Sequence, residues 1–269
     1  LPAFAIGAWN LGYQTLAAAS ALGIAAGWPA SVLETVGFAL SADSALTCVL
    51  FGVLHTLPAL LTALAVAYLW ERIFTARRHR PTDPGWITCA WLFTLLLPPD
   101  TPLPLIAVAM TFAAVIGSHI FGGTGRYLVS PALLGVLFLH FSYPGFTQAA
   151  LPLAENGLVT TWTNLAQAKP TGSLVVVLLG AELGAIGAVS ALACLCGGLY
   201  LAWQGAASWR TLAGGAAGVI FCTWLLALAA TLAEIQDPAW HIPWYWHLAT
   251  GNLAFVLAFI ATDPTTTAL

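Results

Sequence analysis

Charged side chains are scarce in this sequence. Only 6% of the residues are Asp, Glu, Lys or Arg, whereas soluble domains carry roughly 25%. With a mean hydropathy of +0.89, the chain is expected to be an integral membrane protein. It also lacks a GxxxxGK loop, a Ser/His/Asp arrangement and a basic patch, which argues against P-loop chemistry, triad hydrolysis and nucleic-acid partners.

Long apolar stretches are abundant. A bilayer core takes roughly 20 helical residues, and six stretches can enter it: residues 1–27, 47–74, 102–121, 174–203, 211–233 and 243–262. Residues 86–97 and 131–143 are shorter and are predicted to be half-helices. The expected fold is an all-α polytopic helical bundle with broken helices, forming one transmembrane domain over residues 1–269 in contact with membrane lipids. Because the sequence lacks an initial methionine and stops in a threonine-rich turn, both termini are expected to be incomplete.

Basic residues cluster in one loop. It contains Arg72, Arg77, Arg78 and Arg80, out of seven Lys and Arg in total, and the positive-inside rule places it in the cytoplasm. Counting spans from this loop puts residues 122–173, with Arg126 and Lys169, on the outer face. The alternative is that a re-entrant segment has been counted as a span, which would reverse every face after it.

Two breaks interrupt the apolar stretches. Prolines prevent a continuous helix in the first break: Pro98, Pro99, Pro102 and Pro104. The second break is a turn formed by Gly122, Gly123, Thr124 and Gly125, followed by Arg126 and then by the half-helix that starts at Pro131. Unsatisfied backbone groups are too costly against lipid, so such breaks persist only where protein, water or a ligand satisfies them. Both are candidate sites.

Arg126 is a candidate binding residue. Beside the amides of the glycine turn it could hold an anionic group such as a flavin phosphate, and an anchor at the membrane interface is the alternative. The turn itself is not a dinucleotide-binding fingerprint, because no strand precedes it.

Other residue patterns favour structural roles. The cysteines lie in or beside apolar stretches and are expected to be buried thiols rather than iron–sulfur ligands: Cys48, Cys89, Cys194, Cys196 and Cys222. Haem ligation would need two histidines on facing helices, and no pair has a spacing that demands it. Gly180 and Gly184, at GxxxG spacing within residues 174–203, predict a helix that approaches a neighbour closely.

Seven groups of residues occur in a familiar order. They are Leu1, Pro2, Ala3, Phe4, Gly7 and Asn10; Leu97, Pro98, Pro99, Pro102 and Leu103; residues 120–126 with Pro131, Ala132 and Leu133; Phe141, Tyr143 and Pro144; Gly205 with residues 207–210; Pro243, Trp244, Trp246, His247 and Leu248; and residues 261–264. In this collinear set the chain resembles the B subunit of the sodium-translocating NADH:quinone oxidoreductase and the D subunit of the Rnf complex.

The resemblance implies a redox role. Members of this family are subunits of the bacterial inner (cytoplasmic) membrane that carry flavin and pass electrons within a multi-subunit complex coupled to cation movement. The implied partners are other integral membrane subunits and quinone, and the implied cofactor is FMN or another flavin. The family attaches FMN through its phosphate to a threonine, and an alignment on Leu165 and Gln167 puts Thr163 on that threonine and Thr160 on a nearby serine.

The chain departs from the family pattern around Thr163. Gly157 stands where aspartate is expected, and Thr161 and Trp162 replace glycine and alanine. Because tryptophan is far bulkier than alanine, it would hinder a transferase that brings flavin phosphate to the hydroxyl. An ordinary loop threonine is therefore the alternative for Thr163.

Two acidic positions of the family are also replaced. His119 and Ala188 stand where glutamates are expected, and a buried carboxylate is the natural partner for a cation, since an intramembrane charge costs at least roughly 2.5 to 3.5 kcal/mol. These losses argue against cation pumping by the family's route. His119 could carry a proton instead, or be a hydrogen-bonded structural residue, while Asp263 is retained as an ion-pathway candidate or a helix cap.

Three functions therefore remain open from the sequence. The first is a membrane subunit of such an electron-transfer complex, with flavin near Arg126 and Thr163. The second is a scaffold subunit that keeps the fold without the redox chemistry. The third is a small-solute channel, because half-helices that meet at membrane depth also form pores.

Overall fold

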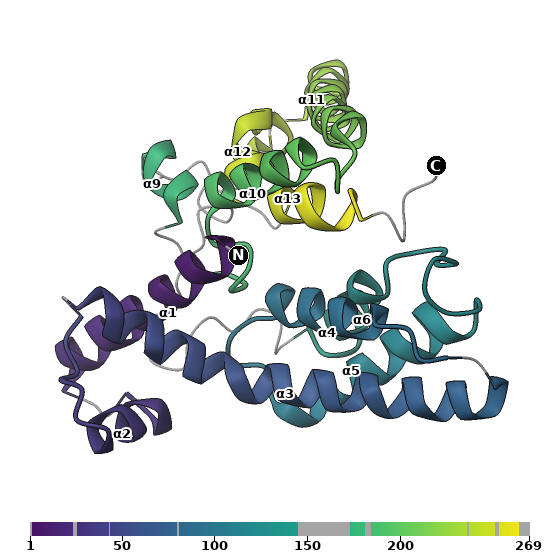
Figure 1. Cartoon of the computed structure of the whole chain (residues 1–269). Coiled ribbons are helices and arrows are strands. Elements are labelled where there is room, and N and C mark those ends of the chain that lie inside the picture. Colours follow the sequence, from purple (N-terminus) through teal and green to yellow (C-terminus); the bar gives the residue numbers. More distant parts are fainter. Residues whose placement is uncertain are drawn as a thin grey trace. The chain divides into compact units, whose positions relative to one another are not determined.

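The computed structural model of the protein describes residues 2–23, 26–42, 44–79, 81–144, 173–180, 184–235, 237–250 and 253–263. All regular structure in these ranges is helical, which confirms the predicted all-α class. The chain divides into two compact units (Figure 1): unit 1 combines Leu1–Gly7 with Asn156–Pro264, and unit 2 combines Ala8–Glu155 with Thr265–Leu269. One transmembrane domain over residues 1–269 stays a prediction.

Unit 2 contains the breaks singled out in the sequence. Its helices are α1 (Pro2–Leu22, whose first residues belong to unit 1), α2 (Trp28–Thr35), α3 (Ala45–Arg78), α4 (Gly85–Leu96), α5 (Leu103–Phe112) continuing into the π-helix η1 (Ala113–His119), and α6 (Pro131–Ser142). The half-helices predicted for residues 86–97 and 131–143 are thus confirmed as α4 and α6. Each has 12 residues and rises about 18 Å, well short of a hydrocarbon core of about 30 Å.

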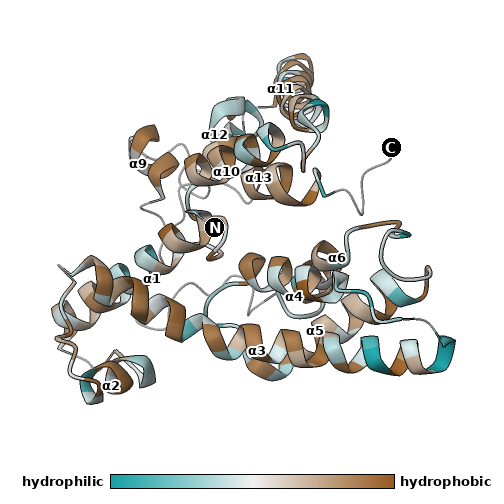
Figure 2. Cartoon of the chain, in the orientation of Figure 1, coloured by the Kyte–Doolittle hydropathy of each residue, from teal (hydrophilic) through white to brown (hydrophobic). Residues whose placement is uncertain are grey.

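Unit 1 holds the later helices. They are α9 (Leu174–Leu179), α10 (Ala191–Trp203), α11 (Trp209–Leu232), the 3₁₀ turn η2 (Pro238–His241), α12 (Trp244–Thr250), α13 (Leu253–Phe255) and the π-helix η3 (Val256–Ile260). By length and composition α11 of unit 1 and α3 of unit 2 can cross a membrane. Figure 2 shows the hydrophobic colour along most of α3, with hydrophilic residues gathered at its C-terminal turns.

The helix predicted over residues 174–203 is wrong. The chain leaves the helical conformation after α9, where Gly180 has φ +92°, and α10 starts only at Ala191 behind Ser190, whose hydroxyl accepts the Ala193 amide at 3.2 Å. Nothing lies within 4 Å of a Cβ built on Gly184. Gly180 therefore serves a turn, and the GxxxG spacing does not mark a helix contact.

In unit 2, α3 runs beside α4 and α5. His55 Nε2 on α3 lies 3.2 Å from the Pro99 carbonyl oxygen ahead of α5, and Trp70 Nε1, farther along α3, donates to the Thr111 hydroxyl at 3.2 Å. Helix α5 therefore follows the direction of α3, so α4 must run the opposite way. The core between them is rich in alanine, including Ala63, Ala67, Ala90 and Ala109, which lets the helices approach closely.

Two glycines let α1 and α3 touch through their backbones. A Cβ on Gly12 would lie 2.0 Å from the Cys48 carbonyl oxygen, and one on Gly52 would lie 2.0 Å from the Ala8 carbonyl oxygen. These obstacles are backbone atoms rather than flexible side chains. The helix pair can accommodate a methyl group only by moving apart.

Gly52→Ala should therefore destabilise the protein by about 1–3 kcal/mol, the usual range for overpacking. A thermal unfolding midpoint measured in detergent would report the loss. Gly218→Ala is the matched control, because nothing lies within 4 Å of a Cβ there and replacing an open helical glycine by alanine stabilises a helix by roughly 0.5–1 kcal/mol. Equal midpoints for the two variants would contradict the close contact.

Candidate functional site

The π-helix η1 places His119 at the end of the apolar helix Leu103–His119. Its wider turn is closed by the bond from the Ile120 amide to the Val115 carbonyl oxygen, at 2.9 Å. Such turns are rare and occur frequently at functional sites. His119 is its last residue and is buried.

The glycine turn satisfies the end of this helix. Gly122, Gly123 and Gly125 have φ values of +118°, +98° and +82°, which glycine adopts far more readily than residues with a Cβ. The Gly122 amide donates to the His119 carbonyl oxygen at 3.3 Å, and the Gly123 amide donates to that of Ser118 at 3.0 Å. The break is thus closed by its own backbone, which is one of the ways in which such a break can persist.

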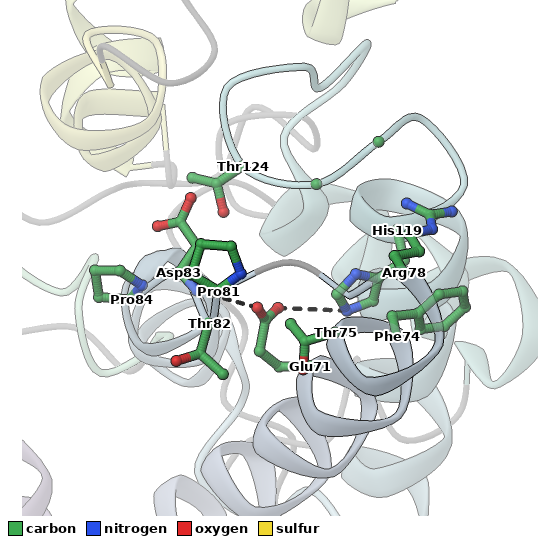
Figure 3. Close-up of a pocket in the computed structure, with 12 residues that line it drawn as sticks. Glu71, Phe74, Thr75, Arg78, Pro81, Thr82, Asp83, Pro84, His119 and Thr124 are labelled. Carbon is green, nitrogen blue, oxygen red and sulfur yellow. Dashed lines mark hydrogen bonds and ion pairs between the residues drawn. The ribbon is translucent and has the colours of Figure 1, made fainter.

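Glu71 on α3 lies opposite His119. Glu71 Oε2 is 3.7 Å from His119 Nε2, and the two side chains are only 9% and 7% exposed. The second carboxylate oxygen, Oε1, accepts the Asp83 amide at 3.2 Å, as the dashed lines in Figure 3 show. A buried carboxylate needs such partners, because an unpaired buried charge is costly.

A row of stacked groups lies beside this pair. The rings of Phe74 and His119 stack with centroids 4.4 Å apart and planes 13° apart. The Arg78 guanidinium carbon lies 5.3 Å from the centre of the Phe74 ring, within cation–π range. The aromatic stack fixes the orientation of the imidazole, and Arg78 adds a donor-rich cation next to it.

These side chains surround a pocket of about 330 Å³, a volume within the range of roughly 300–1,000 Å³ for small-molecule sites. It is lined by Glu71, Phe74, Thr75, Arg78, Pro81, Thr82, Asp83, Pro84, His119, Gly122, Gly123 and Thr124. The charged groups in this lining are two carboxylates and one guanidinium. The balance disfavours an anionic ligand and suits a neutral one that takes hydrogen bonds or protons.

The pocket brings the basic loop and the glycine turn together, and this corrects the predicted topology. Gly122 and Arg78 line the same cavity, and a Cβ on Gly85 would lie 2.5 Å from the Thr124 hydroxyl. The outer-face assignment for Arg126 is therefore wrong if the basic loop is cytoplasmic. The physical reason is that α4 and α5 form a hairpin that returns to its starting face.

The other predicted site residues are dispersed. Gly125 and Arg126 do not line the pocket, and the exposed Arg126 side chain folds back over the turn, with its Cδ 3.2 Å from the position of a Gly122 Cβ. Thr160 and Thr163 lie outside the described residues. Asp263 belongs to unit 1, where it follows η3, and its amide donates to the Ile260 carbonyl oxygen at 3.3 Å.

Sequence reasoning missed Glu71, the residue on which the site is built. A usable signal was present, because Glu71, Phe74 and Arg78 recur at three- and four-residue spacing and so share one face of α3. Nothing in the sequence indicates that this face meets His119, which lies far along the chain.

Comparison with known proteins identifies the family. The sequence model of the NQR2, RnfD, RnfE family matches residues 1–269. The chain belongs to this family. It is 35% identical to the B subunit of the Na(+)-translocating NADH-quinone reductase of Klebsiella pneumoniae strain 342, over 98% of this chain and 68% of that protein. The corresponding subunits from Pseudomonas paraeruginosa and Azotobacter vinelandii are 33% and 34% identical over the same shares.

The family resemblance implies flavin, but the lining of this pocket does not fit FMN. Its phosphate would need cationic and amide donors together. Arg126 lies outside the pocket, and within it Arg78 is opposed by Glu71 and Asp83. In this member of the NQR2, RnfD, RnfE family, the pocket therefore gives no support to flavin binding. Flavin attachment at Thr163, which lies outside the described residues, stays a prediction.

The folding stability of the protein depends on pH through Tyr127, which follows the glycine turn. Burial raises the pKa of its phenol above the usual value of 10.0, although side-chain hydrogen bonds with Thr124 and Ser118 oppose this. A neutral phenol is thus preferred by the folded state. The stability it contributes is complete below the unfolded pKa and is lost as the pH rises through the higher folded pKa.

Tyr127→Phe should therefore weaken the alkaline loss of stability. We expect the thermal midpoint of the unaltered protein to fall above about pH 10, and that of the variant to fall less. Tyr13→Phe on α1, where the tyrosine is exposed, controls for removing a hydroxyl group. Identical alkaline profiles for the unaltered protein and Tyr127→Phe would refute the assignment.

Proposed function

We propose that this chain is a multi-pass subunit, in a bacterial cytoplasmic membrane, of an electron-transfer complex of the NADH-quinone reductase type. The relatives that support this carry that name. Its partners would be the other integral membrane subunits of the complex. Its own contribution would be the pocket at the glycine turn, as the binding site for a quinone headgroup.

The buried Glu71–His119 pair carries this proposal. Reducing a quinone to a quinol takes two electrons and two protons, and the pair lies at a pocket wall where it could deliver a proton to a quinone oxygen. The electrons would come from redox centres of the complex. A quinone ring is neutral, which suits the charge balance of the pocket, and Phe74 offers an aromatic surface beside it.

The Glu71–His119 pair also bears on whether this chain can couple electron transfer to the movement of a cation. His119 stands where the resemblance implies a glutamate, but α3 provides a buried carboxylate at this place through Glu71. A carboxylate and an imidazole in contact are two groups between which a proton can pass. We therefore propose that this site handles protons, and that Arg78 and the Thr82 hydroxyl, which also line the pocket, offer donors to a quinone oxygen.

Glu71→Gln and His119→Gln test the proposal in the assembled complex. Glu71→Gln keeps an acceptor for the Asp83 amide but cannot transfer a proton, so kcat for quinone reduction should fall by roughly 10²-fold, with a smaller change in KM for quinone. His119→Gln should also lower kcat for quinone reduction. The pH profile of kcat should change in both variants.

Glu34→Gln and His140→Gln are matched controls, because both side chains are exposed and lie away from the pocket lining. They should leave kcat and its pH profile unchanged. An unaltered kcat in Glu71→Gln, in complexes that assemble normally, would exclude proton delivery by this pair.

A scaffold without redox chemistry is the second candidate, favoured by Gly157, Thr161 and Trp162, the departures around Thr163. Intact-mass measurement of the purified chain separates the two. If flavin is attached as in the family, the chain should carry an FMN-sized increment that Thr163→Ala removes. A chain without the increment, in a complex whose activity is insensitive to Glu71→Gln, would establish the scaffold.

A further inference from the structure

A second contact between a carboxylate and an imidazole lies at the proline break. His55 Nε2 on α3 is 3.5 Å from Asp100 Oδ1 and 3.2 Å from the Pro99 carbonyl oxygen. The side chains of His55 and Asp100 are 20% and 19% exposed, so they are mostly buried but still accessible. The ring of His55 also stacks on Phe51, with centroids 6.3 Å apart.

The neighbours of His55 determine which ring nitrogen carries hydrogen. Both groups that face Nε2, the Pro99 carbonyl and the Asp100 carboxylate, are acceptors. A bare nitrogen would repel both, so the hydrogen-bond network assigns a hydrogen to Nε2. This leaves Nδ1 as the position where an additional proton can bind.

The break around Asp100 has more acceptors than donors. Pro98, Pro99 and Pro102 have no amide hydrogen, and the Pro98 carbonyl oxygen already accepts the Thr101 amide at 3.3 Å and the Thr101 hydroxyl at 2.8 Å. Among the described residues none donates to Asp100 Oδ2, although this oxygen is buried. A buried carboxylate oxygen without a donor is costly. A positive charge on His55 would compensate the negative charge of Asp100.

The contact lies far from the pocket. His55 and Glu71 are sixteen residues apart on α3, about 24 Å along the helix axis at about 1.5 Å per residue. Asp100 precedes α5 and His119 ends η1, so the two pairs flank opposite ends of Leu103–His119. If the basic loop is cytoplasmic, His55 and Asp100 lie toward the outer face.

Few other groups can titrate in the surroundings. Helices α1, α2, α4, α5 and η1 pack against α3. Their titratable side chains are Tyr13 on α1, Glu34 on α2, Cys89 on α4 and His119 on η1, while α5 has none. His119 already faces Glu71, so Asp100 is the acidic partner that the structure gives to His55.

The geometry points to a proton-binding site formed by His55 and Asp100 at the end of unit 2 opposite the pocket. On loading, a proton from water bonds to Nδ1 of His55, and the resulting imidazolium pairs through its Nε2–H with the Asp100 carboxylate. On release the Nδ1–H bond breaks and the proton returns to water. No electron is transferred.

Infrared spectroscopy of the full chain in lipid nanodiscs tests this assignment. The ring bands of an imidazolium should grow as the pH of the unaltered protein is lowered through roughly pH 8 to 5, and His55→Gln should remove the part of this change that His55 contributes. Asp100→Asn should move that part to lower pH, because the carboxylate that stabilises the imidazolium is gone. A pH-dependent difference spectrum that His55→Gln leaves unchanged would overturn the proposal.

Asp100→Asn gives an independent reading if His55→Gln does not fold. In the ¹⁵N spectrum of histidine-labelled protein, one histidine should require a lower pH to become an imidazolium when Asp100 is neutralised, because its paired carboxylate is gone. His140→Gln, at an exposed histidine of α6, should leave the imidazolium signal of His55 in place. An unchanged set of imidazolium signals in Asp100→Asn would show that His55 and Asp100 do not share a proton.

Discussion

The terminal carbonyl and amide groups of a helix need hydrogen-bond partners, and lipid offers none. In unit 2 the protein itself provides such partners at both ends of Leu103–His119. At the glycine turn, left-handed residues fold the amides back onto the last carbonyls of η1. At the proline break, missing amides reduce the number of donors, and the hydroxyl of Thr101 and the ring of His55 bond the remaining carbonyls.

Helix α3 holds both ends in place. It is the long continuous helix of unit 2, and it contributes an imidazole to one break and a carboxylate to the other. The partner in each case comes from the interrupted chain. The roles of acid and base are thus reversed between the two ends, and each break is tied to the same rigid element. Alanines on α3 and its neighbours allow the close packing that this arrangement needs.

The helical class and the positions of both breaks can be predicted from the sequence, because proline, glycine and the bilayer thickness act locally. The contact between Glu71 and His119 cannot, since it depends on whether α4 and α5 return to the same face. Counting spans gives the wrong answer there, because a largely apolar helix of 12 residues is compatible both with part of a membrane crossing and with a segment that turns back. Gly180 and Gly184 are ambiguous for a similar reason. Glycine four residues apart suits a helix contact, but a left-handed turn at Gly180 uses the same residue type.

The π-helix before the glycine turn determines which way the side chain of its last residue, His119, points. In an α-helix each residue rotates the next side chain by about 100°, and a π-helical turn accommodates one residue more than an α-turn does. His119 meets Glu71 because residues 113–119 follow the wider spiral. A change to the ordinary spiral would shift the register by one position and swing the imidazole away from the carboxylate. The acid and the base could thus be uncoupled by a small rewinding of the backbone, while the helices around them keep their places.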